Sequence, residues 1–378
     1  MKTSSILLAS VTAVLAGSAR ADADIDLRSA FGFDSNPFEL SDVIGRREAF
    51  FIDGDASVEA TGEAVHGWRK RADIGFSGRI YERDDHEADQ ARLWVRARGG
   101  TEERDNQHGW DLSVRAQARD RTYVSRLTGA EATDSLGNDI GDRYDSMLGE
   151  IEGEWRFPKV KIGRFSIGAN GTYRNYWRDY GSLGLTRLDY YEYALTPTAE
   201  LGSGTDRVRV RVTGTERRYF NRRVDDAIGN PVPGTDLRYR YLGGDVRWQH
   251  RFSERGTFEL GTDYEWREDN GVGFGDRTLW SFGAEWNWRP DENSRITLDG
   301  RYRKRAFDNQ TGDETINDEA PEKKGIEFAV RYARPFPFVD IEGFSLIAEA
   351  GYEDYDNTDD PRFVYERWTA LIGVRQQF

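Results

Sequence analysis

The feature that most constrains this chain is an alternation of apolar and polar residues with a period of two, repeated along almost its whole length. In one segment, for example, the apolar residues Leu112 and Val114 stand on either side of Ser113. Successive side chains of a β-strand point to opposite faces, so this pattern predicts strands with one apolar and one polar face. We predict such strands at 24–33, 47–61, 67–81, 90–101, 109–124, 144–157, 162–178, 188–201, 206–219, 238–252, 257–268, 278–289, 294–305, 325–334, 343–355 and 364–378.

The composition excludes most soluble folds. Charged residues make up 32% of the chain and the mean hydropathy is -0.77, yet there are 11 Trp, 18 Tyr and 20 Phe. Disordered chains are poor in aromatic residues, and a soluble sandwich or propeller would have to bury the charges of its inner faces. A membrane barrel turns apolar side chains to lipid and polar ones to its lumen. We therefore predict an all-β, antiparallel, up-and-down transmembrane β-barrel of about 16 strands, within a range of roughly 14–18.

The lengths of the predicted connections support this fold and suggest an orientation. Links from even to odd strands are mostly tight, although 102–108 is rather long, and links from odd to even strands are mostly longer. Outer-membrane barrels have short periplasmic turns and long extracellular loops. Both ends of the barrel should therefore lie in the periplasm, and the long links should face the cell exterior. The long links are 34–46, 125–143, 220–237 and 306–324.

The first 21 residues have the pattern of a cleaved signal peptide. Lys2 precedes a short apolar run, and Ala19-Arg20-Ala21 forms a small-residue cleavage site. We therefore predict a signal peptide at 1–21 and one barrel domain at 22–378, in the outer membrane of a Gram-negative bacterium. The chain has no cysteine, which excludes disulfides and a lipid anchor attached through cysteine.

The last predicted strand and the tryptophans indicate partners in the membrane. Trp368, Ile372 and Phe378 share the apolar face of that strand. A terminal aromatic residue in this register resembles the signal that the barrel-assembly machinery reads, so we assign that role to Phe378. Most tryptophans fall near predicted strand ends, where aromatic girdles meet the membrane interfaces. The expected partners are this machinery and outer-membrane lipid and lipopolysaccharide, with no nucleic acid.

The polar faces of several predicted strands are rich in arginine. A guanidinium stays charged and suits carboxylate or phosphate groups. A lumen wall with many of them could pass small anions or an anionic polymer such as a polysaccharide. The candidate lumen residues are Arg79, Arg92, Arg96, Arg98, Arg115, Arg119, Arg209 and Arg211.

Carboxylates on neighbouring strands offer a second interpretation of these arginines. Opposite charges on adjacent strands pair across the ladder. Arginines that are paired in this way would only hold the wall together. The candidate counter-charges are Glu150, Glu152, Glu154, Asp263 and Glu265. The sequence leaves open which arginines are paired, and for the cluster as a whole we favour a role in solute passage.

Catalytic and metal chemistry have little support in the sequence. His66, His86 and His108 fall in predicted links, and His250 lies on an outward face near Ser253. A membrane esterase would also need a group that orients the histidine and an oxyanion site, and neither is recognisable. No metal-ligand spacing is present. We therefore expect no enzyme activity, no cofactor and no metal site.

One short motif resembles known families. The segment FGFDSNPF at 31–38 resembles the Y-D-x-N-P segment of a β-barrel porin family that often accompanies exopolysaccharide or capsule synthesis genes. That resemblance implies an outer-membrane channel, with exopolysaccharide export as one expected role. Surface lipoprotein assembly modifier barrels carry a similar start, but they usually have an N-terminal helical repeat region that this chain lacks. From the residues alone, Asn36-Pro37 makes a turn that Asp34 caps.

Two functions therefore remain open from the sequence. The leading hypothesis is a passive or semi-selective pore for polar solutes, most plausibly anions or carbohydrates. The alternative is a non-conducting structural or interaction barrel, such as one for surface protein or lipoprotein assembly, that works through its loops. The sequence names neither the solute nor the direction of transport.

The predicted orientation can be tested on whole cells. An epitope inserted after Gly137, in the long link 125–143, should be accessible to antibody on intact cells, because long links of such barrels are extracellular. Labelling that requires a broken outer membrane would contradict this orientation.

Overall fold

A computed structural model describes most of the chain after the predicted signal peptide, and residues 1–21 lie outside it. Among the described residues, no helix is long and apolar enough to cross a membrane. The described residues are 22–40, 47–65, 68–82, 88–101, 107–122, 132–133, 140–177, 188–220, 222–226, 230–273, 275–307, 322–336, 341–357 and 364–378.

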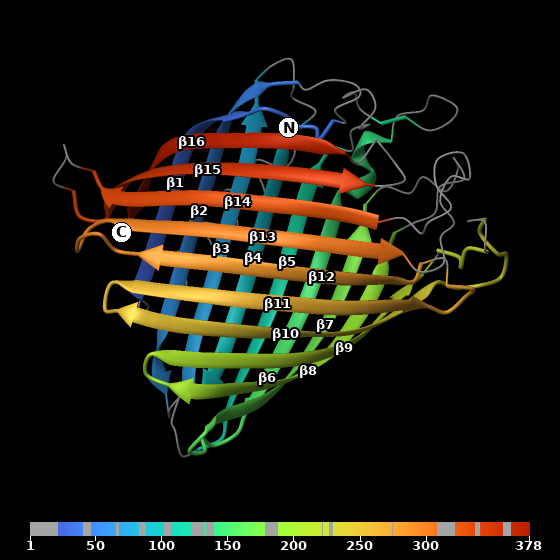
Figure 1. Cartoon of the computed structure of the whole chain (residues 1–378), viewed down its shortest axis with the longest axis horizontal. Coiled ribbons are helices and arrows are strands. Elements are labelled where there is room, and N and C mark those ends of the chain that lie inside the picture. Colours follow the sequence, from blue (N-terminus) through green and yellow to red (C-terminus); the bar gives the residue numbers. More distant parts are fainter. Residues whose placement is uncertain are drawn as a thin grey trace.

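These residues form a closed barrel in which every strand is antiparallel to both neighbours and follows the chain order (Figure 1). The strands are β1 (Asp22–Asp34), β2 (Ala49–Val65), β3 (Trp68–Tyr81), β4 (Gln90–Thr101), β5 (Gly109–Arg121), β6 (Ser146–Arg156), β7 (Gly163–Tyr176), β8 (Tyr190–Ser203), β9 (Asp206–Tyr219), β10 (Arg238–Ser253), β11 (Gly256–Asp269), β12 (Arg277–Trp288), β13 (Arg295–Phe307), β14 (Glu322–Pro335), β15 (Phe344–Asn357) and β16 (Tyr365–Gln377). A short 3-10 helix, η2 (Gly141–Tyr144), precedes β6.

All sixteen predicted strands are present, so the predicted fold class and strand number are confirmed. The largest difference in boundary is at the end of β2, which runs four residues beyond the predicted 61 to Val65, and other differences lie beside long links. The strand predicted at 325–334, for example, begins three residues earlier, at Glu322. Its first residues, Glu322, Lys323 and Lys324, are all charged, so alternation of apolar and polar residues could not reveal them.

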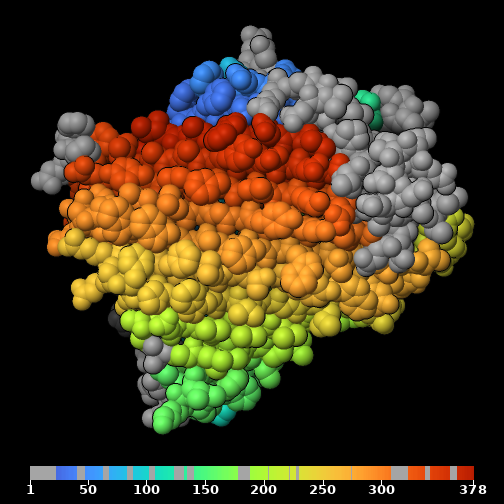
Figure 2. Space-filling model, viewed as in Figure 1, coloured from blue at the N-terminus to red at the C-terminus, as the bar shows by residue number. Residues whose placement is uncertain are grey.

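The barrel closes where the first strand meets the last. β1 pairs with β16 from Asp26 opposite Gln377 to Asp34 opposite Thr369. Beyond that ladder, the backbone N–H of Phe378 donates to the carbonyl of Ile25 over 2.9 Å, and the N–H of Ile25 donates back over 3.2 Å. Closure matters because a sheet edge in lipid would leave backbone groups without partners. Figure 2 shows the strands as a continuous wall.

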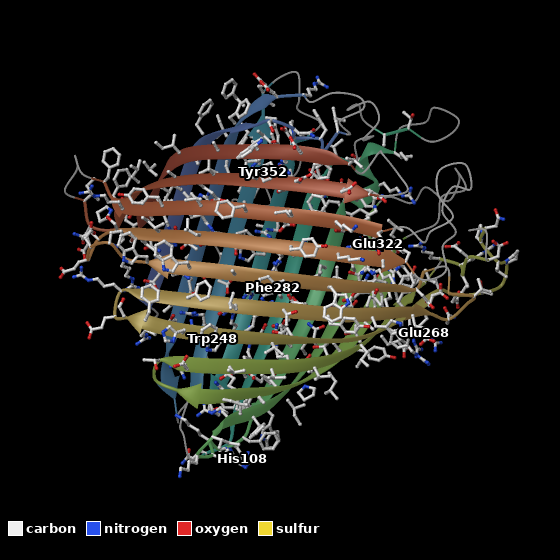
Figure 3. The ribbon with its side chains drawn as sticks, in the orientation of Figure 1. His108, Trp248, Glu268, Phe282, Glu322 and Tyr352 are labelled. Carbon is white, nitrogen blue, oxygen red and sulfur yellow. The ribbon has the colours of Figure 1, made fainter. Side chains whose placement is uncertain are left out.

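The outward face of this wall is apolar. Ile80 is 63% exposed, Ile151 is 52% exposed and Val114 is 49% exposed. Phe282 and Trp248 also lie on this face (Figure 3). Large apolar side chains are exposed to this extent only where lipid surrounds them, and a closed barrel satisfies the backbone there. The protein is therefore a multi-pass β-barrel of the Gram-negative outer membrane.

The connections alternate in length as predicted, with tight turns at one end of the barrel. Only two residues separate β8 from β9, and Gly204 in this turn has φ of +72°, a conformation that favours glycine. In the turn between β12 and β13, the N–H of Asn293 and the N–H and hydroxyl of Ser294 bond to Asp291. These hydrogen bonds hold the pKa of Asp291 below its usual value.

The two faces of β5 should differ sharply in their tolerance of charge. Replacing Val114 with arginine should destabilise the barrel by about 2–4 kcal/mol at the bilayer midplane, because the guanidinium would enter hydrocarbon. The same change at Ser113, on the lumen face, should cost much less. Urea unfolding in lipid vesicles measures both, and equal costs would mean that the faces are interchanged, since a slip of one residue swaps them.

Candidate functional site

The candidate site is the inner wall of the barrel, where the structure separates the predicted arginines by their partners. Because Leu112 and Val114 are exposed on the outer face, Arg115 and Arg119 of the same strand face the lumen. The same alternation turns the other predicted arginines inward from β3, β4 and β9. These are Arg79, Arg92, Arg96, Arg98, Arg209 and Arg211.

Two of these arginines are held in close ion pairs. Arg79 lies 3.0 Å from Asp53 and its guanidinium also stands over the ring of Phe51, 4.1 Å from the centroid. Arg211 lies 2.6 Å from Asp245. Both guanidinium groups are therefore part of the wall, as expected for arginines that pair with neighbouring strands.

Three more arginines reach a carboxylate only at the limit of an ion pair. Arg98 lies 3.9 Å from Asp73, and Arg209 lies 4.0 Å from Asp245. Arg115 stands directly opposite Glu150 in the ladder, and their charged atoms are 3.9 Å apart. Such loose pairs neutralise little charge in a polar lumen.

The remaining three, Arg92, Arg96 and Arg119, have no ion pair within the described part of the chain. The register makes this more unusual, because Arg92 stands directly opposite Arg119 in the β4–β5 ladder. Like charges in directly opposite positions are destabilising. Arg121 follows Arg119 two residues later on the same face of β5, and Arg174 of β7 stands in line with Gln117 of β5 across the intervening strand.

We call Arg92, Arg119, Arg121 and Arg174 the arginine wall. Arg121 and Arg174 also lack an ion pair among the described residues, although Arg174 stands 5.8 Å from the ring centroid of Tyr190. All four guanidinium groups come from β4, β5 and β7 on one side of the lumen. The candidate set had omitted Arg174, yet its place in the period-two pattern of 162–178 could have identified it.

The predicted counter-charges on β6 do not neutralise this wall. Glu150 contacts Arg115 and accepts a hydrogen bond from Asn170 at 3.0 Å. Glu152 stands opposite Ser113, whose hydroxyl donates to it over 3.4 Å. Glu154 stands opposite Asp111 and has no ion pair among the described residues. Glu152 and Glu154 therefore form no ion pair with an arginine among the described residues, because the register sets other residues opposite them.

The predicted counter-charges on β11 are paired, but with partners that were not predicted. Asp263 lies 2.6 Å from Arg247, and Glu265 lies 3.1 Å from Arg277. The sequence reading also missed Asp245, which is 8% exposed and has Arg211, Arg247 and Arg209 within 4.0 Å. Carboxylates and arginines are therefore paired at several positions of β9–β12, on the side of the lumen away from the arginine wall.

A buried cluster joins the first and last strands. Asp34 is 0% exposed and accepts two hydrogen bonds from Arg367 of β16, at 3.0 Å from Nε and 2.5 Å from the terminal nitrogen. The hydroxyl of Tyr81 donates to the same carboxylate over 2.9 Å. Asp34 also accepts from the N–H of Asn36 at 3.0 Å, so the predicted capped turn is confirmed.

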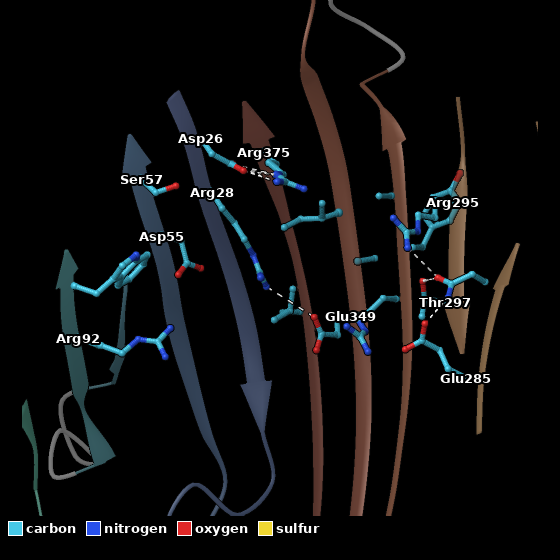
Figure 4. Close-up of a pocket in the computed structure, with 18 residues that line it drawn as sticks. Asp26, Arg28, Asp55, Ser57, Arg92, Glu285, Arg295, Thr297, Glu349 and Arg375 are labelled. Atoms are coloured by element: carbon cyan, nitrogen blue, oxygen red, sulfur yellow. Dashed lines mark hydrogen bonds and ion pairs between the residues drawn. The ribbon is translucent and has the colours of Figure 1, made fainter. Parts of the chain in front are cut away.

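Two cavities lie on the inner face of the barrel. The larger is about 650 Å³ and extends across the closure between β1 and β16 (Figure 4). Its charged lining groups are Asp26, Arg28, Asp55, Arg92, Glu285, Arg295, Arg331, Glu349 and Arg375. The smaller cavity, about 370 Å³, lies between β7 and β11. Its charged lining groups are Lys159, Arg164, Glu200, Arg207, Arg209, Arg247 and Glu259.

One histidine makes a contact with a carboxylate that the sequence did not reveal. His250 lies on the outer surface with Nδ1 3.0 Å from a carboxylate oxygen of Asp206, directly opposite it in the ladder. A carboxylate can orient a histidine in this way, but no serine or threonine hydroxyl bonds to His250 among the described residues. His66 and His86 lie outside the described residues. No group of three metal-ligating side chains occurs within the described ranges.

No protein-family model and no curated protein matches this sequence. Solved structures do match. OmpT of Vibrio cholerae, an outer membrane protein, is 9% identical, with a TM-score of 0.49 over 95% of this chain and 99% of its own. A BenF-like porin from Pseudomonas fluorescens is 11% identical, with a TM-score of 0.49 and the same coverage. An anion-selective porin from Comamonas acidovorans is 9% identical, with a TM-score of 0.43 and again the same coverage. At these values the likeness adds no argument about solute or selectivity.

The Asp34 cluster should be a main source of stability at the closure. Changing Asp34 to asparagine should cost about 3–5 kcal/mol, because it leaves the largely buried guanidinium of Arg367 without its closest counter-charge and with only Glu39 at 3.9 Å. The control is Asp24→Asn, on the same face of the same strand, where the side chain is exposed. Urea titration in detergent measures both, and equal midpoints for the two variants would contradict a role for this cluster in closure.

Proposed function

We propose that this barrel is an outer-membrane channel for polar solutes and that its lumen favours anions. The observation that carries the proposal is the arginine wall, which gathers four guanidinium groups without a carboxylate partner among the described residues. Such an arrangement costs stability, since like charges repel across a ladder. An anion in the lumen would relieve that repulsion. Such an arrangement is therefore expected in a protein that transports anions.

The field of this wall would act over a limited part of the lumen. Salt screens a charge over about 8–10 Å at physiological ionic strength, so distant loops contribute little to the potential beside the wall. The chain carries a net charge of -14, but the lumen carboxylates Asp245, Asp263 and Glu265 form ion pairs with arginines on neighbouring strands. Glu152 and Glu154 stand opposite Ser113 and Asp111, six or more residues along β5 from Arg119, which is about 20 Å and beyond this screening distance. The local potential beside the arginine wall is therefore positive in an acidic protein.

Export of an anionic polysaccharide is a narrower form of the same proposal. Its sequence support was the motif at 31–38. Asp34 and Asn36 of that motif are both 0% exposed. Asn36 bonds to the N–H of Leu40 at 2.7 Å and to its carbonyl at 2.9 Å, so the motif has a structural use without any solute. The arginine wall is the remaining support for a polyanion.

Planar-bilayer recordings in a salt gradient test the proposal. The reversal potential of the wild type should have the sign expected for a channel that is more permeable to anions than to cations. Replacing both Arg92 and Arg119 with glutamine should lower the anion-to-cation permeability ratio roughly threefold or more, because half of the wall's charge is removed. The control is the double replacement of Arg238 and Arg240 with glutamine, which removes an equal charge from the outward register of β10.

Cation preference in the wild type, or an unchanged ratio in the double variant, would contradict anion selection by the wall. A folded barrel without conductance would favour the non-conducting interaction barrel instead. Enzyme activity is not part of the proposal, since no nucleophile accompanies His250 in the described residues.

A further inference from the structure

Trp94 differs from the other tryptophans of this protein in the face that it occupies. The chain has 11 Trp. The others lie in the outward register, where, for example, Trp155 is 57% exposed and Trp280 is 54% exposed. Trp94 falls between Leu93 and the outward-facing Val95, and it lines the larger cavity inside the barrel. Lipid contact therefore explains the other tryptophans but not Trp94.

The strand register forms a small surface beneath the indole of Trp94, which we call the shelf. Asp26, Ser57, Gly75 and Trp94 stand directly opposite one another across β1, β2, β3 and β4. Any side chain at Gly75 would overlap the benzene ring of the indole, so the glycine gives the ring room to lie over β3. One side of the ring thus covers Gly75, while the residue lines the cavity.

Aromatic rings lie over several other glycines of the described barrel, and Phe51 and Tyr355 are two examples with structural partners. Phe51 lies over Gly32, is 2% exposed and packs against Tyr81. Tyr355 lies over Gly325 and its hydroxyl donates to Glu327. Trp94 is half-buried instead, and its indole N–H bonds to no residue of the described chain. An indole N–H that lines a cavity without a protein partner is available to a ligand.

The groups around the shelf suit a polyhydroxylated ligand that carries a negative charge. The guanidinium of Arg92 lies over the ring of Trp94, 5.1 Å from its centroid, and has no ion pair among the described residues, so a sugar would pack on the indole beside this guanidinium. Asp55 and Ser57 of β2, two strands away from Trp94, line the same cavity and offer hydroxyl-binding oxygens (Figure 4). The cavity volume of about 650 Å³ lies within the range of ligand pockets, roughly 300–1,000 Å³.

We propose that Trp94, Arg92, Asp55 and Ser57 form a binding site for an acidic sugar. The C–H groups of the pyranose ring pack against the electron-rich indole face. Asp55 and Ser57 bond to the hydroxyl groups, and Arg92 binds the carboxylate or phosphate substituent. An inorganic anion would gain nothing from the indole, and a hydrocarbon would leave the charged groups unpaired. The site deepens the proposed function, on which it rests, by naming its solute class.

Isothermal titration calorimetry on the folded full-length barrel in detergent tests this site without requiring conductance. The probes are galacturonate, galactose and acetate. Galacturonate should bind most tightly, because only it combines a pyranose ring with a carboxylate. Replacing Trp94 with alanine should raise the dissociation constant for galacturonate about tenfold, whereas Trp94→Phe should retain most of the affinity. Arg92→Gln should make galacturonate and galactose bind alike.

The matched control is Trp280→Ala, which removes an indole from the outer face and should leave binding unchanged. Heat-modifiable mobility in electrophoresis verifies that each variant is folded. Equal galacturonate affinity in the wild type and in Trp94→Ala would overturn the proposal, as would acetate binding as tightly as galacturonate or no saturable binding at all. Anion preference in bilayers is measured separately, so failure of the sugar site and failure of the channel are distinguishable.

Discussion

The structure depends on the closed hydrogen-bonded ladder, because lipid offers no partner to a backbone N–H or carbonyl. Every strand of this barrel pairs on both sides, and β1 completes the circle with β16. Once the ladder is closed, alternation assigns each side chain to lipid or to the lumen. The buried ion pair between Asp34 and Arg367, in residues 333 positions apart, lies on that last junction and fixes its register.

Closure also determines how charge is distributed inside. The ladder fixes which side chains stand opposite one another, and the same residue types then give different results in different sectors. Over β9–β11, Asp245 and Asp263 lie among three arginines and offset much of their charge. Over β4–β5, Arg92 meets Arg119 and no carboxylate intervenes. The first arrangement stabilises the wall, whereas the second leaves a positive surface that can act on solutes.

The sequence predicted the strands and the faces well, because alternation is a local property that each segment carries by itself. It could not predict the ion pairs. Whether Glu154 meets an arginine or Asp111 depends on the register between two strands, and that register depends on a link of uncertain length. Likewise, nothing local distinguishes Trp94 from the lipid-facing tryptophans except its place in the alternation, which marks it as a lumen residue.

The central claim is that the β4–β7 side of the lumen attracts anions because its arginines are unpaired. Anomalous diffraction from crystals soaked in bromide tests it most directly, since bromide is located without reference to transport. The account predicts bromide beside Arg92, Arg119, Arg121 and Arg174, and weaker or no occupancy beside Arg211 and Arg247, whose charges are satisfied. Bromide at the paired arginines with none at the arginine wall would contradict the account.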